Sequence, residues 1–115
     1  MRIELTRQAE DDLDQAFDHF FLAHLDLGAG AEHAFQLATD RIERSLSNIG
    51  RLAQAPGIGM AHEDLAKGLR HVTLDEAIYW FTPLADEGVL RVEGIFHTGQ
   101  DHLRHIMKRL EGGTT

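Results

Sequence analysis

The sequence contains no cysteine, only two prolines, one tryptophan and one tyrosine. Without cysteine the chain has no disulfide framework, no thiolate zinc site and no cysteine nucleophile. It has no apolar run near the roughly 20 residues that a membrane-spanning helix needs. Its first residues, Met1–Leu5, lack the long apolar stretch of a secretory signal. We therefore expect a cytoplasmic protein that does not contact a membrane.

Acidic side chains outnumber basic ones, and the excess lies in the first half of the chain. The 115 residues carry a formal net charge of −8. A chain of this sign repels phosphates, so we expect no direct nucleic-acid binding by the protein alone. The segment Asp101–Leu110 reverses the sign through Arg104, Lys108 and Arg109. The length predicts a single domain spanning residues 1–115.

The first half of the chain carries the spacing of two long amphipathic helices. Thr6 stands where the N-cap of a helix is expected, and apolar residues recur every three or four positions from Ala9 to Leu27. The same spacing returns from Ala34 to Ala53, and Pro56 ends it because proline lacks an amide proton. Glycines 28 and 30 separate the two segments, which together predict an antiparallel helical hairpin.

The remaining segments read as strands with one short helix. Alternation of apolar and polar residues predicts strands over 2–5, 69–74 and 89–97, and 77–81 is apolar on both faces. The order β-α-α-β-β-β-α predicts an α+β, two-layer fold, in which an antiparallel sheet packs against the N-terminal helical hairpin and a short C-terminal helix follows. Residues 57–64 are expected to form a loop, 75–76 and 86–88 turns, and 112–115 a frayed tail.

The last strand divides its side chains between two faces. Strict alternation places Leu90, Val92 and Phe96 on the face that the hairpin covers. The opposite face then carries Arg91, Glu93, Ile95 and His97, which we expect to project together toward the C-terminal helix or a partner.

Four segments in order resemble the RelE/ParE superfamily of bacterial type II toxins. They are Leu5–Leu13, Pro56–Gly59, Gly68–Arg70 and Val92–His102. The tail Gly99-Gln100-Asp101-His102-Leu103-Arg104-His105 is more similar to the ParE branch than to the RelE branch. Where a common family ending reads His-Gly-Ala-Arg-Asp, this chain has Gln100 in place of the arginine.

The resemblance implies a toxin that stops growth by binding DNA gyrase and stabilises the plasmid that encodes it. It also implies a cognate antitoxin whose flexible segment wraps the toxin. We expect no cofactor, no metal ion and no catalytic residue. The residues predicted to bind the target or the antitoxin are Arg70, Arg91, Ile95, His97, Arg104, His105, Lys108 and Arg109.

Two other functions remain open at this point. RelE-type relatives cut mRNA on the ribosome, and the arginines with His97, His102 and His105 could supply the cations and acid–base groups for that reaction. However, the resemblance implies that RelE-type relatives also use a tyrosine near the C-terminus, and this chain has none there. Its one tyrosine, Tyr79, lies in the most apolar strand, where we expect it to belong to the core. The third reading is a module that binds an antitoxin and has lost its toxicity. His97, Asp101 and His105 have a spacing that could ligate a metal ion. The simpler interpretation is that Asp101 caps the last helix and that His97 forms hydrogen bonds at the end of the strand.

Overall fold

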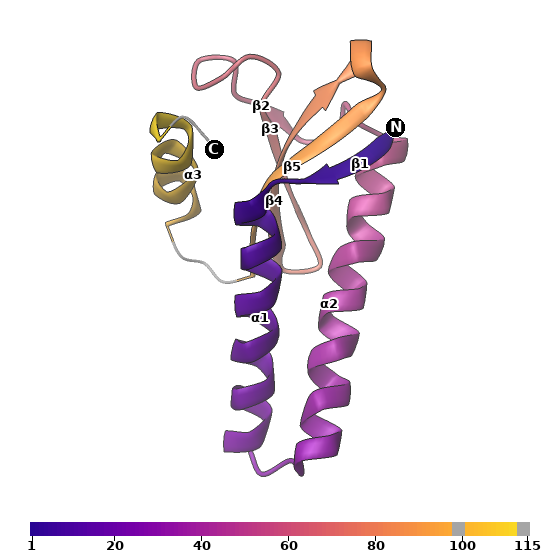
Figure 1. Ribbon diagram of the computed structural model, residues 1–115, viewed down its shortest axis with the longest axis vertical. Helices are drawn as coiled ribbons and strands as arrows, with labels where there is room; N and C mark the ends of the chain where they lie inside the picture. The colour runs from indigo at the N-terminus through magenta and orange to yellow at the C-terminus, as the bar shows by residue number, and fades with distance from the viewer. Residues whose placement is uncertain (98–100, 113–115) are drawn as a thin grey trace.

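The computed structural model describes residues 1–97 and 101–112, and it has the predicted order of elements with two short additions (Figure 1). Gln100 and the tail residues 113–115 lie outside the described residues. The elements are β1 (Arg2–Leu5), α1 (Arg7–Asp26), α2 (Ala31–Gln54), β2 (Met60–Ala61), β3 (Arg70–Leu74), β4 (Ala77–Leu84), the 3-10 turn η1 (Ala85–Glu87), β5 (Val89–Phe96) and α3 (His102–Glu111).

The helices begin and end where the sequence predicted. The Thr6 hydroxyl oxygen accepts a hydrogen bond from the Ala9 amide over 3.1 Å and caps α1. Asp101 caps α3 in the same way, since its carboxylate accepts from the Arg104 amide over 3.3 Å. These caps satisfy amides that have no partner inside the first turn of a helix. α2 ends at Gln54, two residues before Pro56.

The sheet is mixed rather than wholly antiparallel. Its strand order is β1-β5-β4-β3-β2, and β1 pairs with β5 in parallel, from Arg2 opposite Val89 to Leu5 opposite Val92. A parallel pair needs a long connection between its strands, and here everything from α1 to β4 supplies it. The segment expected as a loop over 57–64 contains β2, which pairs with β3.

A bulge in β5 reverses the predicted orientation of the end of that strand. The register runs from Phe81 opposite Val92 directly to Trp80 opposite Gly94, so Glu93 is the extra residue. One extra residue shifts the alternation by one position and moves every later side chain to the other face. Ile95 therefore lies on the hairpin side and Phe96 on the opposite side, the reverse of the prediction.

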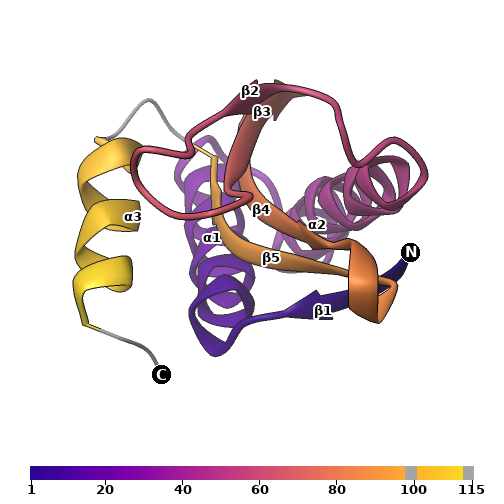
Figure 2. The same ribbon diagram turned by 90° about the horizontal axis from the view of Figure 1, so that it is seen from above.

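The sheet is covered on both faces. The hairpin side buries the main cluster, whose members include Leu13, Ile49, Tyr79, Phe81 and Val92. The other side buries Leu69, Trp80 and Phe96 under Ile106 of α3. Figure 2 shows α3 and α2 on opposite sides of the strands.

The two long helices extend well beyond the sheet (Figure 1). The molecule measures 47 × 27 × 22 Å, and its long axis follows the hairpin. Near its far end Phe17 and Phe35 meet edge to face at 5.3 Å. Phe35, which falls on the apolar spacing of α2, remains 56% exposed there and lies outside the core. The spacing placed it on the helix stripe, but the sheet does not reach that far.

The turn between β3 and β4 predicts a stabilising substitution. Asp75 and Glu76 form this two-residue turn with φ values of 49° and 66°, a conformation that glycine adopts at lower cost. We expect Glu76→Gly to raise the free energy of unfolding by roughly 0.5–1 kcal/mol, measured by urea denaturation. Glu43→Gly, at an exposed site within α2, should lower it by about 1 kcal/mol. A loss of stability in both variants would contradict this reading of the turn.

Candidate functional site

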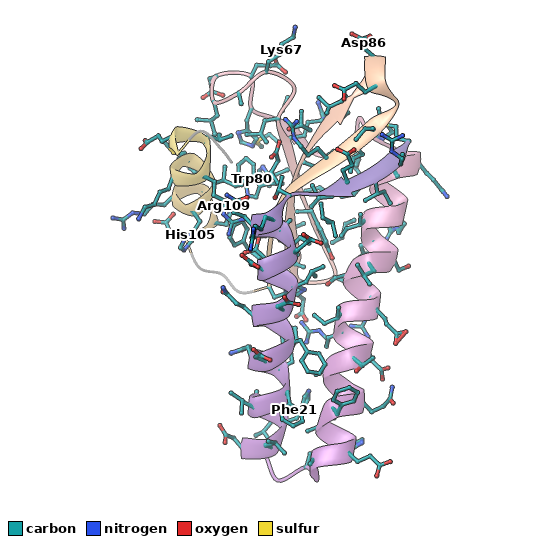
Figure 3. The ribbon with its side chains drawn as sticks, in the orientation of Figure 1. Phe21, Lys67, Trp80, Asp86, His105 and Arg109 are labelled. Atoms are coloured by element: carbon teal, nitrogen blue, oxygen red, sulfur yellow. The ribbon has the colours of Figure 1, made fainter. Side chains whose placement is uncertain are left out.

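A groove of about 390 Å³ runs between α1, the end of β5 and α3. It brings together four of the predicted site residues with acidic and aromatic side chains of α1. Figure 3 labels two of the four, His105 and Arg109. The lining residues are Gln8, Asp11, Asp12, Gln15, Ala16, His19, Phe20, Ile95, Phe96, His97, His105 and Arg109.

An ion pair between Asp12 and Arg109 joins α1 to α3 at this groove. The guanidinium makes two hydrogen bonds to the carboxylate, of 2.7 and 2.8 Å. Asp12 also accepts from the Ile95 amide over 2.9 Å, and Arg109 donates to the Glu93 carbonyl over 3.2 Å. The side chains are only 10% and 23% exposed. Arg109 therefore fastens α3 to the domain and does not lie on a free surface.

His97 faces the hairpin rather than the opposite side of the sheet. Its Nε2 lies 2.6 Å from the Ser45 hydroxyl, and its ring meets Phe20 edge to face at 5.3 Å. Burial lowers the pKa of His97 to about 4, and the Arg41 guanidinium acts in the same direction while Asp12 opposes it. The imidazole is neutral at physiological pH. The prediction that His97 closes the strand through a hydrogen bond fits this geometry.

The structure separates the other predicted residues of the sheet. Ile95 is 2% exposed within the main core. Arg91 pairs with Glu93 over 3.1 Å on the opposite face, where Glu93 also accepts from Thr82. The expectation that Arg91, Ile95 and His97 project together is therefore wrong, because the bulge intervenes between them.

Arg70 is engaged by the loop that precedes β2. Its guanidinium donates to three backbone carbonyls, those of Gly57, Ile58 and Gly59, over 2.7–3.0 Å. These bonds satisfy carbonyls that no strand or helix pairs. Arg70 thus holds a loop in place. No local pattern in the sequence predicts this, because the geometry of the loop depends on β2.

The outer face of α3 carries the remaining predicted residues. Arg104, His105 and Lys108 are exposed, and Leu103 and Met107 lie beside them with 42% and 41% of their surface exposed. His105 also stacks on Phe96 at the mouth of the groove. A helix face that combines cations with exposed apolar groups is suited to binding another protein.

Tyr79 and the acidic and histidine side chains bear on the alternatives of RNA cleavage and metal binding. Tyr79 is fully buried and its hydroxyl accepts from Asn48, so this phenol is unavailable to a substrate. Within residues 1–97 and 101–112, no group of three or more histidine, aspartate or glutamate side chains is arranged to hold a metal ion. In the same part of the chain, no helix has the length and apolarity to cross a membrane.

Asp12 is the site residue that sequence reasoning missed. It lies in a run of acidic residues at the start of α1, where carboxylates favour the helix dipole, and nothing in the run distinguishes it from Asp11 or Asp14. Its position opposite the β5 bulge, 97 residues from Arg109, is a product of the fold.

The Asp12–Arg109 pair predicts a strong coupling between distant residues. In a double-mutant cycle of Asp12→Asn and Arg109→Met, we expect a coupling energy of about 1.5–3 kcal/mol, because both groups are largely desolvated. The exposed Arg2–Glu4 pair, at 3.5 Å, should give about 0.5 kcal/mol or less in the same urea denaturation experiment. Equal coupling in the two pairs would contradict the role assigned to Asp12.

The neutral state of His97 predicts a loss of stability in acid. Folding lowers the pKa of His97 from the ordinary value of 6.5 to about 4, so protons bind the unfolded chain more readily. The contribution of neutral His97 to the free energy of unfolding is complete above about pH 6.5 and is lost as the pH falls toward 4. We expect His97→Gln to flatten the decline in melting temperature over this range, whereas His33→Gln, at an exposed site on α2, should leave it unchanged. A parallel decline in wild type and His97→Gln would contradict the prediction.

Comparison with known proteins shows a shared fold. No protein-family model matches the chain, and no curated protein does. Among solved structures, the chain is similar to one described as "Chromosomal ParDE TA system from P. aeruginosa", with 23% sequence identity and a TM-score of 0.56. The match covers 85% of this chain and 96% of the other. The chain therefore has the fold of a component of a ParDE toxin–antitoxin system.

Proposed function

We propose that this protein is a ParE-like toxin of a type II toxin–antitoxin module, which stops growth by binding and poisoning DNA gyrase. The fold shared with a ParDE component supports this proposal, as do the four sequence segments that resemble the superfamily. The gyrase target rests on the resemblance of the tail to the ParE branch.

The observation that carries the proposal is the exposed basic face of α3. Three predicted binding residues, Arg104, His105 and Lys108, share that face with Leu103 and Met107. The chain as a whole has a net charge of −8. A cationic and apolar patch on such a protein is therefore a candidate surface for binding a partner. The inner side of the same helix is sealed by Ile106 and Arg109, which hold the patch rigidly.

A cognate antitoxin would cover apolar surface on the helical hairpin. Leu22, Leu27 and Phe35 are 57%, 83% and 56% exposed, and Figure 3 shows Phe21 toward the far end of the same hairpin. A flexible segment that folds on binding is suited to covering such an elongated surface. Burial of these side chains in the complex would stabilise the toxin.

The arrangement favours protein binding over ribonuclease chemistry. The cations Arg70 and Arg109 are held by carbonyls or a carboxylate, the groove is lined by Asp11 and Asp12, and Tyr79 is buried. Carboxylates at a cleft repel the phosphates of RNA, and a cation already paired is less available to a developing negative charge.

The direct test is a gyrase assay with the purified protein. We expect it to inhibit supercoiling and to accumulate cleaved DNA complexes at concentrations that stop growth, and the antitoxin encoded by the adjacent reading frame should reverse both effects. New mRNA ends during growth arrest, with gyrase unaffected, would support the RelE-type reading instead. Normal growth at high expression would support the module without toxicity.

Charge reversal on α3 should remove toxicity without unfolding the protein. We expect Arg104→Glu/Lys108→Glu to lower gyrase inhibition by at least about tenfold, since each unfavourable charge at an interface costs on the order of 1 kcal/mol or more. The melting temperature should change little because both side chains are exposed. The control Arg44→Glu/Lys67→Glu makes the same change at exposed sites elsewhere and should retain activity. Full inhibition by the folded α3 variant would show that the target binds another surface.

A further inference from the structure

Three histidines from three separate segments gather around Trp80, the single tryptophan of the chain. His62 follows β2, His71 lies within β3, and His102 is the first residue of α3. The ring centroids of His62 and His71 each lie 4.8 Å from that of Trp80, and the centroid of His102 lies 5.7 Å away. The cluster lies on the sheet face opposite the hairpin and takes no part in the groove described above.

The hydrogen bonds in this cluster require a neutral His102 and at least one neutral imidazole in the His62–His71 pair. The Trp80 indole N–H donates to Nδ1 of His102 over 3.0 Å, so that nitrogen must carry no proton. Nε2 of His62 and Nδ1 of His71 lie 2.6 Å apart, and one of the two must be bare to accept from the other. A doubly protonated histidine is a donor at both nitrogens. Protonation of His102 removes the acceptor for the indole, and protonation of both His62 and His71 sets two donors against each other.

The charged groups around the cluster are engaged elsewhere or point to solvent. Glu63 accepts from the Gly68 amide, Asp101 caps α3, and Arg70 binds the carbonyls of residues 57–59. None of the ion pairs found within residues 1–97 and 101–112 includes a histidine of the cluster. The other charged or titratable groups of the 62–69 loop and the first turn of α3 are Asp64, Lys67, Arg104 and His105, all exposed.

A positive charge added to any of the three histidines would therefore have no carboxylate paired with it. Burial lowers the pKa of His71, and the neighbouring His62 and His102 lower it further. The neutral cluster covers Trp80, which is fully buried, and it does so together with Leu69 and Ile106. The loop over 62–69 and the first turn of α3 meet at this point.

We propose that His62, His71 and His102 form a proton-sensitive clasp, which holds the 62–69 loop and the start of α3 over Trp80 while neutral and releases them when it takes up protons. Arg109 lies near the other end of α3 and keeps that end tied to Asp12. Opening therefore begins at the N-terminal turn of α3 and uncovers the indole of Trp80. This inference holds whether or not the protein acts on gyrase.

Trp80 reports on the clasp directly because it is the sole source of indole fluorescence. The experiment measures collisional quenching of Trp80 by acrylamide between about pH 7.5 and about pH 5.5, the range in which histidines titrate, with far-UV circular dichroism recorded at each pH. We expect the quenching constant to rise at least about twofold, reversibly, while the helix signal stays constant. His97 titrates lower, near 4, and lies on the other face of the sheet. A flat quenching constant in the wild type would overturn the proposal.

Variants separate the clasp from general loosening in acid. In His62→Gln/His102→Gln, uncharged amides that can both donate and accept replace two of the three imidazoles, and we expect the rise in quenching to fall to less than about half of the wild-type rise. His33→Gln, at an exposed site on α2, should behave as the wild type does. An undiminished rise in the double variant would overturn the proposal. If that variant fails to fold, hydrogen exchange of the Trp80 indole N–H in the wild type decides: protection must fall in step with histidine protonation, and constant protection would overturn the proposal.

Discussion

The carboxylate of Asp12 is the point on which the architecture depends. It accepts two hydrogen bonds from Arg109 and one from the backbone of β5, so a single side chain of α1 connects the hairpin, the sheet and the last helix. The contact occurs beside the Glu93 bulge, where the ladder between β4 and β5 is interrupted. Asp12 satisfies the backbone amide of Ile95, two residues beyond the bulge.

That contact also leaves two different exposed surfaces on an acidic protein, one on α3 and one on the helical hairpin. Arg109 binds Asp12 and thereby holds α3 against α1, whereas Arg104 and Lys108 of the same helix are exposed. A rigid helix presents cations at lower entropic cost than a flexible tail would. The distal hairpin offers a different surface, apolar and beyond the reach of the sheet, around Phe35 and Leu27. The two surfaces are suited to two kinds of partner.

The histidines of the chain differ in what surrounds them. His97 is held neutral by burial near Arg41, and it reports on the stability of the whole domain. His62, His71 and His102 surround an indole at the edge of α3, where a change of charge acts on one contact rather than on the main core. Histidines that look alike in the sequence thus have different consequences because their neighbours come from distant segments.

Most of the helices and strands could be predicted from the sequence, because their signals are local. Hydrophobic spacing gave both long helices, Thr6 and Asp101 marked two of the helix starts, and Pro56 marked the end of α2. These features depend on neighbours within one turn of the chain, and the α+β class followed from their order. The parallel pairing of β1 with β5 did not follow, since it depends on where a strand lies after more than eighty residues of intervening chain.

The tertiary structure alone decided the faces and the partners. One extra residue at Glu93 exchanged the sides of Ile95 and Phe96, and no composition or alternation marks which residue of a strand will bulge. Contacts across the fold then assigned Arg70 to a loop, Arg109 to Asp12 and Trp80 to His102. Side chains of the same type differ here only in what the folded chain places within hydrogen-bonding distance, and that information is not local to any segment of the sequence.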